Sequence, residues 1–181
     1  MDWLIPAASV LLLTMFIGPD LSAQEKNRVL VGMSLEEFRR VHPKVAHDDA
    51  KSDGQWRRPE KLCGLEGSWC YTFKDGKLDW ALWDIYIDEL NQTNFDKCLK
   101  GTRQLIEAYT KNYGKPFEVK EPNPIFKDPH KTRHWGYDVL YAKWQTPSVK
   151  FKIGFDFMGG KGDYHFLVKM GFFRPDYPYF E

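Results

Sequence analysis

The sequence predicts an α+β fold of two layers, with helices packed on one face of an antiparallel sheet. Apolar residues recur at three- and four-residue steps in two segments, as on one face of a helix. In several other segments they alternate with polar residues, as in strands with one buried face. A helix followed by an antiparallel meander occurs twice, which suggests a tandem αβββ repeat. The 181 residues suit one domain, expected over 24–181 with halves at 28–90 and 91–175.

The composition excludes several classes of protein. The chain has 26 Lys and Arg against 25 Asp and Glu, so its formal net charge of +1 provides no general attraction to nucleic acid or anionic membranes. Hydrophobic residues make up 43% of the chain, too many for a disordered protein. The 16% of aromatic residues is the most informative feature, because such side chains either fill a core or form a contact surface.

The first 23 residues have the pattern of a signal peptide. Residues 3–18 are apolar and uncharged, and this run is shorter than the roughly 20 residues of a membrane span. Cleavage is expected after Ala23, although Asp2 in place of a basic residue also fits a misplaced start codon or an uncleaved anchor. Loss of Asp2 and Asp20 changes the net charge from +1 to +3. We expect a periplasmic or secreted protein that has no membrane span after cleavage.

The first helix of the mature chain is expected to begin at Ser34. Ser34 and Glu37 have the spacing of a capping box, in which each side chain bonds to the backbone of the other. Apolar residues at three-residue steps follow until Pro43 ends the helix. Residues 44–57 are polar and are predicted to form an exposed loop.

A hairpin is expected after this loop. Residues 69–73 alternate between apolar and polar, and residues 78–87 form a second strand-like run. The Asp75-Gly76 pair between them is typical of a tight hairpin turn.

The second helix has the clearest pattern in the chain. Apolar residues recur at three- and four-residue steps over residues 95–113. Thr93 or Asn94 is suited to cap its start, and Gly114 is suited to end it. Residues 115–131 contain four prolines and are interpreted as a stiff connector within the domain.

Three strands are expected to close the fold, at residues 137–146, 149–157 and 164–173. In the middle strand the odd positions are apolar and the even positions are polar or Gly, which predicts one buried and one solvated face. The tail, residues 174–181, is expected to be extended with its aromatic residues packed on the body. The lysines expected on the solvated faces are Lys143, Lys150 and Lys152.

Three short motifs resemble one known group of proteins. They are Gly-Met-Ser-Leu-Glu-Glu-Phe at 32–38, the Trp-x-Tyr-x-Phe strand at 69–73, and Asp-Gly-Lys-Leu at 75–78. This layout resembles the β-lactamase-inhibitor-protein-like superfamily, which includes small lipoproteins of the outer-membrane assembly machinery. The resemblance covers residues 32–82 and continues in the second half only as an order of elements. It implies an exported, non-enzymatic binding protein, and it assigns no functional residues.

The three cysteines allow one disulfide in an oxidising compartment. If Glu66 and Gly67 form a hairpin turn, Cys63 and Cys70 lie opposite each other, and this is the pair we predict. The competing pair uses Cys98 of the second helix.

No cofactor and no metal is expected. His130 and His134 are four residues apart and would share a metal on a helix, but the following strand favours surface histidines. The glycine-rich segment 159–162 lacks the Lys-Ser/Thr pair of a phosphate loop and is interpreted as a hairpin turn.

The aromatic residues are the main candidates for a binding surface. Trp80 and Trp83 are three apart and so face opposite sides of a strand. Exposed aromatic residues on a sheet face or loop rim mark contacts with protein or carbohydrate, whereas buried ones fill the core. We therefore predict an exported non-enzymatic protein that binds a protein or carbohydrate partner. The candidate contact residues are Trp80, Trp83, Trp135, Trp144 and Tyr164.

An enzyme is the alternative. An exported hydrolase would use a His/Asp site near residues 130–138 and 165, built from His130, His134, Asp138 and His165. The two hypotheses differ in one observation. An enzyme brings several of these side chains together in one place, whereas a binding protein presents an exposed aromatic patch.

Overall fold

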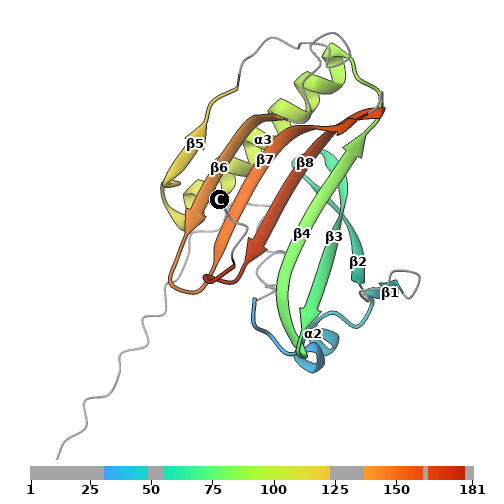
Figure 1. The fold of residues 1–181 in the computed structure, drawn as a ribbon, viewed down its shortest axis with the longest axis vertical. Coiled ribbons are helices and arrows are strands. Elements are labelled where there is room, and N and C mark those ends of the chain that lie inside the picture. Colours follow the sequence, from blue (N-terminus) through green and yellow to red (C-terminus); the bar gives the residue numbers. More distant parts are fainter. Residues whose placement is uncertain (1–30, 49–54, 123–136, 161–162, 178–181) are drawn as a thin grey trace, which may run out of the picture.

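The computed structural model describes residues 31–48, 55–122, 137–160 and 163–177. Two helices and eight strands follow one another in the chain (Figure 1): α2 (Leu35–Val41), β1 (Ala46–Asp48), β2 (Gln55–Leu62), β3 (Leu65–Lys74), β4 (Lys77–Ile87), α3 (Gln92–Tyr113), β5 (Glu118–Lys120), β6 (Tyr137–Gln145), β7 (Lys150–Gly160) and β8 (Asp163–Phe173). The predicted signal peptide lies outside the described residues. Within the described ranges, neither helix is long and apolar enough to cross a membrane.

All eight strands form one antiparallel sheet in the order β1-β2-β3-β4-β8-β7-β6-β5. A helix followed by four strands occurs twice along the chain, and the last strands of the two runs, β4 and β8, pair in the middle of the sheet. The predicted antiparallel sheet with helices packed against it is therefore confirmed. Two expectations were wrong in detail, because β1 and the start of β2 lie inside the predicted loop over 44–57, and β5 lies inside the predicted connector.

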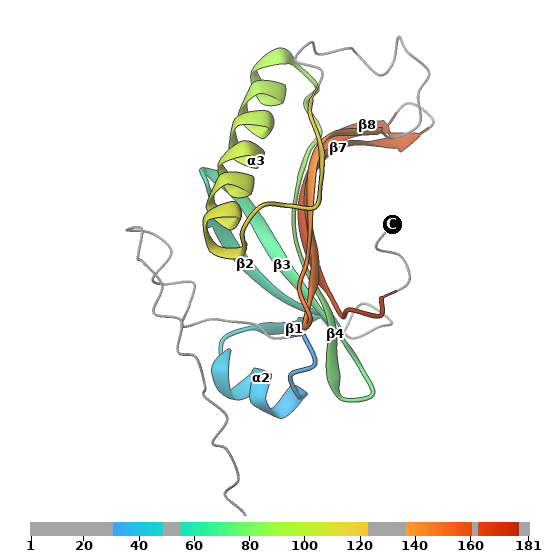
Figure 2. The same cartoon turned by 90° about the vertical axis from the view of Figure 1, so that its left-hand side faces the viewer.

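Both helices lie on the same side of the sheet, but they cover it unequally (Figure 2). The long helix α3 packs along β6, β7 and β8. The short helix α2 lies at one end, where its buried Phe38 packs with Tyr71, Leu78 and Ala81. The helix layer therefore consists of one long helix and one short helix at the end of the sheet.

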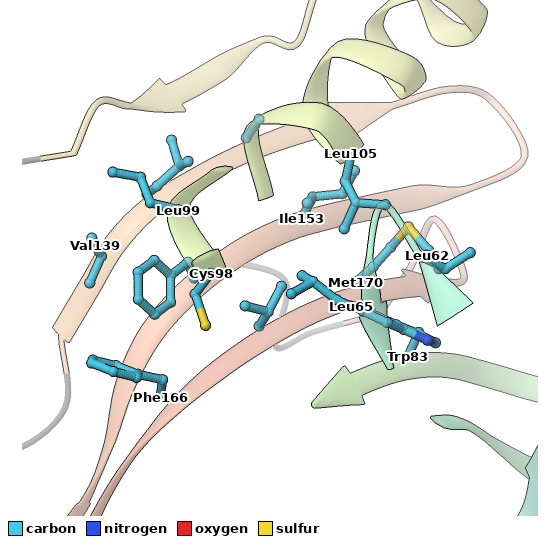
Figure 3. Packing of buried hydrophobic residues seen from close by; sticks show 14 of the residues in the cluster. Leu62, Leu65, Trp83, Cys98, Leu99, Leu105, Val139, Ile153, Phe166 and Met170 are labelled. Atoms are coloured by element: carbon cyan, nitrogen blue, oxygen red, sulfur yellow. The ribbon is translucent and has the colours of Figure 1, made fainter. Parts of the chain in front are cut away.

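The main core lies between α3 and the sheet (Figure 3). Helix α3 contributes Phe95, Cys98, Leu99 and Leu105 on the face that the sequence periodicity predicts. The odd-numbered residues of β7 meet them and are almost completely buried, which confirms the predicted alternation in that strand. Trp69 packs against both this core and the smaller one beneath α2, so the two clusters are continuous.

The helix starts show where local sequence signals succeed and where they mislead. At α2 the Ser34 Oγ accepts a hydrogen bond from the Glu37 N–H at 3.1 Å, and the Glu37 carboxylate accepts one from the Ser34 N–H at 3.0 Å. This confirms the predicted capping box. At α3 the cap is Asn91, whose side chain accepts from the Asn94 N–H at 2.8 Å, so the expectation of a cap at Thr93 or Asn94 was wrong.

The hairpin turns fix the register of the first half. Asp75 and Gly76 form the predicted turn between β3 and β4, both with positive φ, as such two-residue turns require. The turn between β2 and β3 is formed by Cys63 and Gly64, with φ of 49° and 78°. The sequence predicts this turn three residues later, at Glu66-Gly67, and that prediction was wrong.

Candidate functional site: the open face of the sheet

The side of the sheet opposite the helices is called the open face, because no helix of the described part of the chain lies on it (Figure 2). Register partners share a face, and successive residues of a strand alternate between faces. The open face therefore carries the even-numbered residues of β7, the odd-numbered residues of β8 and, from Trp80 on, the even-numbered residues of β4. On the outer strands, Glu118 of β5 and Asp138, Tyr141 and Lys143 of β6 lie on the same face.

Ion pairs cover the outer half of the open face. Lys143 Nζ lies 2.9 Å from a Glu118 oxygen, and the Tyr141 hydroxyl donates to the other Glu118 oxygen at 2.5 Å. These hydrogen bonds lower the pKa of Glu118, and the same contact raises the pKa of Tyr141 to about 12. The Lys152 ammonium lies 4.5 Å from the centre of the Tyr141 ring, in a cation–π contact. The charges here are matched within the sheet itself.

Two aspartates meet at the centre of this network. Asp138 of β6 and Asp156 of β7 are register partners on the open face. Lys152 Nζ lies 3.2 Å from Asp138, and Lys169 Nζ forms a close ion pair with Asp156. Asp156 is only 4% exposed, and burial together with its hydrogen bond to Asp138 raises its pKa to about 6. Burial acts to raise the pKa of Asp138 too, but the hydrogen bond from Asp156 and the nearby Lys152 charge lower it overall.

An exposed patch lies next to this network, on three neighbouring strands. Tyr86 of β4 is 54% exposed and Met158 of β7 is 40% exposed, the two largest values for apolar side chains on the open face. Between them, on β8, the His165 ring contacts the Tyr86 ring edge-on at 5.0 Å, and His165 is the register partner of Met158. We call Tyr86, Met158 and His165 the exposed patch.

Aromatic residues also occupy the opposite end of the open face. Trp80 is half-buried and is the register partner of Phe173. The Phe173 ring lies over Gly171, where a Cβ atom would come within 2.6 Å of it, and the Tyr177 ring packs on Phe173 at 4.8 Å. The expected packing of the tail aromatics therefore holds for Tyr177, while residues 178–181 lie outside the described residues.

The predicted contact residues divide between the core and the surface. Trp83 and Trp144 are 0% and 2% exposed, and their indole N–H groups donate to the carbonyl oxygens of Glu60 and Gly114. They are core residues, which corrects the expectation that they contact a partner. Trp80 and Tyr164 are half-buried, on β4 and β8. Trp135 lies outside the described residues.

The predicted disulfide is not formed, and none of the three cysteines is bonded to another. Cys63 is in the β2–β3 turn itself, and Cys70 lies five residues beyond the start of β3, which corresponds to about 15 Å or more of strand. A disulfide needs Cα atoms within about 7 Å. Cys98 is on the helix side of the sheet, whereas Cys70 lies opposite Leu82 on the open face, so this pair is separated by the sheet.

The residues of the alternative hydrolase site are not brought together among the described residues. Asp138 pairs with Asp156 and Lys152, whereas His165 contacts Tyr86. His130 and His134 lie outside the described residues. In the described ranges, no group of three or more His, Cys, Asp or Glu side chains is arranged to hold a metal ion.

Sequence reasoning missed Tyr86, Met158, Asp156 and Lys169. The alternation of β7 carried a signal for two of them, because it assigns the polar Asp156 and also Met158 to the solvated side. Neither signal shows which residues of other strands lie beside them.

In comparisons with known proteins, no protein family, no curated protein and no solved structure matched this chain.

Proposed function

We propose that this chain is an exported, non-enzymatic binding protein that holds a protein or carbohydrate partner on the open face. The single observation that carries the proposal is the exposed patch of Tyr86, Met158 and His165. Exposed aromatic and thioether side chains on the same sheet face are typical of contact surfaces, because they gain free energy by leaving water and adapt to a partner's shape.

The rest of the open face supports the same assignment. Its charged side chains are matched in pairs, as in Glu118 with Lys143 and Asp138 with Lys152, so a general electrostatic attraction is not what the face offers. A sheet built from long strands is a rigid platform, and a rigid surface loses little entropy when it binds. The expected partner therefore lies across β4, β8 and β7, and the exposed patch forms the centre of its interface.

The proposal also covers the internal repeat, the superfamily and the location of the protein. We interpret the two runs as halves of a tandem αβββ repeat in two layers, within one domain, to which the short strands β1 and β5 are added at the two edges of the sheet. The motifs at 32–38, 69–73 and 75–78 support membership of the β-lactamase-inhibitor-protein-like superfamily. A periplasmic or secreted location is the corresponding expectation for the chain after cleavage at Ala23.

Site-specific photo-crosslinking tests this function. A photoreactive phenylalanine analogue at Tyr86 is expected to capture a partner in the native envelope or medium, where the same analogue at Glu107 does not. Glu107 is the control because its exposed side chain lies on α3, on the other side of the sheet. A second comparison places the analogue at His165. The double variant Y86A/M158A is then expected to capture at least about tenfold less partner than the otherwise unchanged protein with the analogue at the same position, as the loss of a binding hot spot does.

The outcomes separate the possible partners. A protein partner is identified by mass spectrometry of the adduct, and a carbohydrate partner by binding to a glycan array that Y86A abolishes. Equal capture from position 86 and position 107 would contradict the proposal.

A further inference from the structure

The buried pair of carboxyl groups on the open face is the feature from which a further property follows. Asp138 and Asp156 face each other on neighbouring strands, where directly opposite Cβ atoms are about 5 Å apart. Asp156 is nearly inaccessible to water. Among the described residues, none donates a hydrogen bond to its Oδ1 atom, although Oδ2 contacts Lys169.

Ionisation of both carboxyl groups is costly in this arrangement. A buried oxygen that accepts no hydrogen bond carries a desolvation cost, and like charges at this separation repel each other. One proton held between the two groups removes both costs, because the protonated Asp156 then donates to the Asp138 carboxylate. The pKa changes agree with a shared proton. The pKa of Asp156 is raised by burial and by its hydrogen bond to Asp138, whereas the pKa of Asp138 is lowered overall.

We infer that Asp138 and Asp156 share one proton in the folded protein, and that its loss or gain makes the centre of the open face responsive to pH. Above the titration of the pair, two carboxylates are matched by Lys152 and Lys169. Below it, Asp156 is neutral, so the group formed by Asp138, Asp156, Lys152 and Lys169 has one net positive charge. A partner's acidic group placed there binds more tightly as the pH falls, because it takes the position of the lost negative charge.

Other ionisable side chains face the pair from every neighbouring strand. They are Glu118 of β5, Tyr141 and Lys143 of β6, Asp84 and Tyr86 of β4, and His165 of β8. His165 needs a control of its own, because it lies on the same face and its ring contacts Tyr86. The inference about proton sharing does not depend on a partner, whereas its effect on binding rests on the function proposed above.

Carboxyl ¹³C NMR of the aspartate-labelled protein tests the sharing directly. A titration between about pH 3 and pH 8 is expected to show one aspartate with a midpoint near pH 6, and this signal is lost in D156N. In D138N the midpoint of Asp156 should fall by at least about one pH unit, because an amide donates a hydrogen bond to the carboxylate and carries no charge. K169M should raise it, because the neighbouring positive charge is removed.

Two controls complete the titration. H165N should leave the Asp156 signal in place, which distinguishes it from a histidine titration, and D96N on the exposed surface of α3 should not move it. The inference is overturned if no aspartate titrates above about pH 5, or if D138N leaves the midpoint unchanged.

The effect on binding is tested by repeating the crosslinking from position 86 at pH values above and below the midpoint of the Asp156 titration. Partner capture that increases below the midpoint in the wild type and is constant in D156N supports the effect on binding. Capture that is independent of pH in the wild type overturns that effect while leaving the NMR result intact. Absence of capture at any pH would instead contradict the proposed function, so the two failures are distinguishable.

Discussion

At the scale of single residues, Gly67 and Trp83 show how closely the first half of the sheet is packed. A Cβ atom at Gly67 would lie 2.6 Å from the Trp83 ring and 2.6 Å from the Asp84 carbonyl oxygen. Real Cβ atoms do not approach so closely, so the indole of Trp83 occupies the space that a side chain would need. This glycine is required by its neighbours and not by its own backbone conformation.

Substitution of Gly67 by alanine should therefore destabilise the fold. We expect G67A to lower the free energy of unfolding by about 2–3 kcal/mol, because Trp83 must move and its hydrogen bond to Glu60 is strained. Chemical denaturation followed by tryptophan fluorescence measures this. The matched control is G154A, where the new Cβ would lie 3.5 Å from its nearest neighbour, and a change below about 1 kcal/mol is expected. Equal losses in both variants would contradict the packing argument.

The alternation of faces also operates at this scale. Trp80 and Trp83 lie on opposite sides of β4, as their spacing predicts. The spacing does not say which side is buried, because that depends on where the helices pack. The same uncertainty explains why Trp144, on the helix side of β6, was expected on a contact surface.

At the scale of elements, the capping box stabilises the first turn of α2, a helix of only seven residues. Ser34 and Glu37 satisfy each other's backbone N–H groups, and the hydrogen bonds from Ser34 lower the pKa of Glu37. An isolated helix of this length is not stable in water. The buried side chain of its own Phe38 and the cap at its start together hold α2 in place.

Removal of the cap is the corresponding prediction. S34A should lower the free energy of unfolding by about 1 kcal/mol, because the Glu37 N–H at the helix start loses its acceptor and the Glu37 carboxylate loses the Ser34 hydroxyl donor. S34T should retain most of the stability, since a threonine hydroxyl accepts and donates the same hydrogen bonds. Thermal unfolding followed by circular dichroism compares the three proteins. A loss in S34T as large as that in S34A would show that the serine acts in some other way.

Turns mark the limit of prediction for elements. The prediction of the Asp75-Gly76 turn was correct, because both residues tolerate positive φ and no second pair of turn-forming residues lies nearby. For the hairpin before it, Cys63-Gly64 and Glu66-Gly67 each offer a glycine in second place. The structure uses the first, which extends β2 and β3 to a pairing from Leu62–Leu65 to Trp56–Tyr71. That shift is what separates Cys63 from Cys70.

At the scale of the whole molecule, the two runs of elements share one core. The β4–β8 pairing joins them through eight register pairs, from Trp80–Phe173 to Ile87–Phe166. Leu65 of the first half packs against α3 of the second at Gly101, where a Cβ atom would be only 2.6 Å away. Trp83 belongs to the same cluster as Leu105 and Met170.

We therefore expect the two halves to unfold together. Tryptophan fluorescence and far-ultraviolet circular dichroism should report the same midpoint in urea, as in a two-state transition. Fragments 28–90 and 91–175, prepared separately, should remain largely unfolded, because each loses a partner for its last strand and part of its core. Two resolved transitions, or a folded fragment, would show that the halves are independent domains.

The sequence by itself determined the parts of this protein that depend on local patterns. These are the helix face over residues 95–113, the Ser34 capping box, the Asp75-Gly76 turn and the alternation of β7. Only the tertiary structure decided how strands distant in the chain lie beside one another. The pairing of β4 with β8 and of β6 with β7 brings Tyr86 to His165 and Asp138 to Asp156. Local periodicity assigns a residue to a face, but neighbours on that face are set by the burial of the whole core.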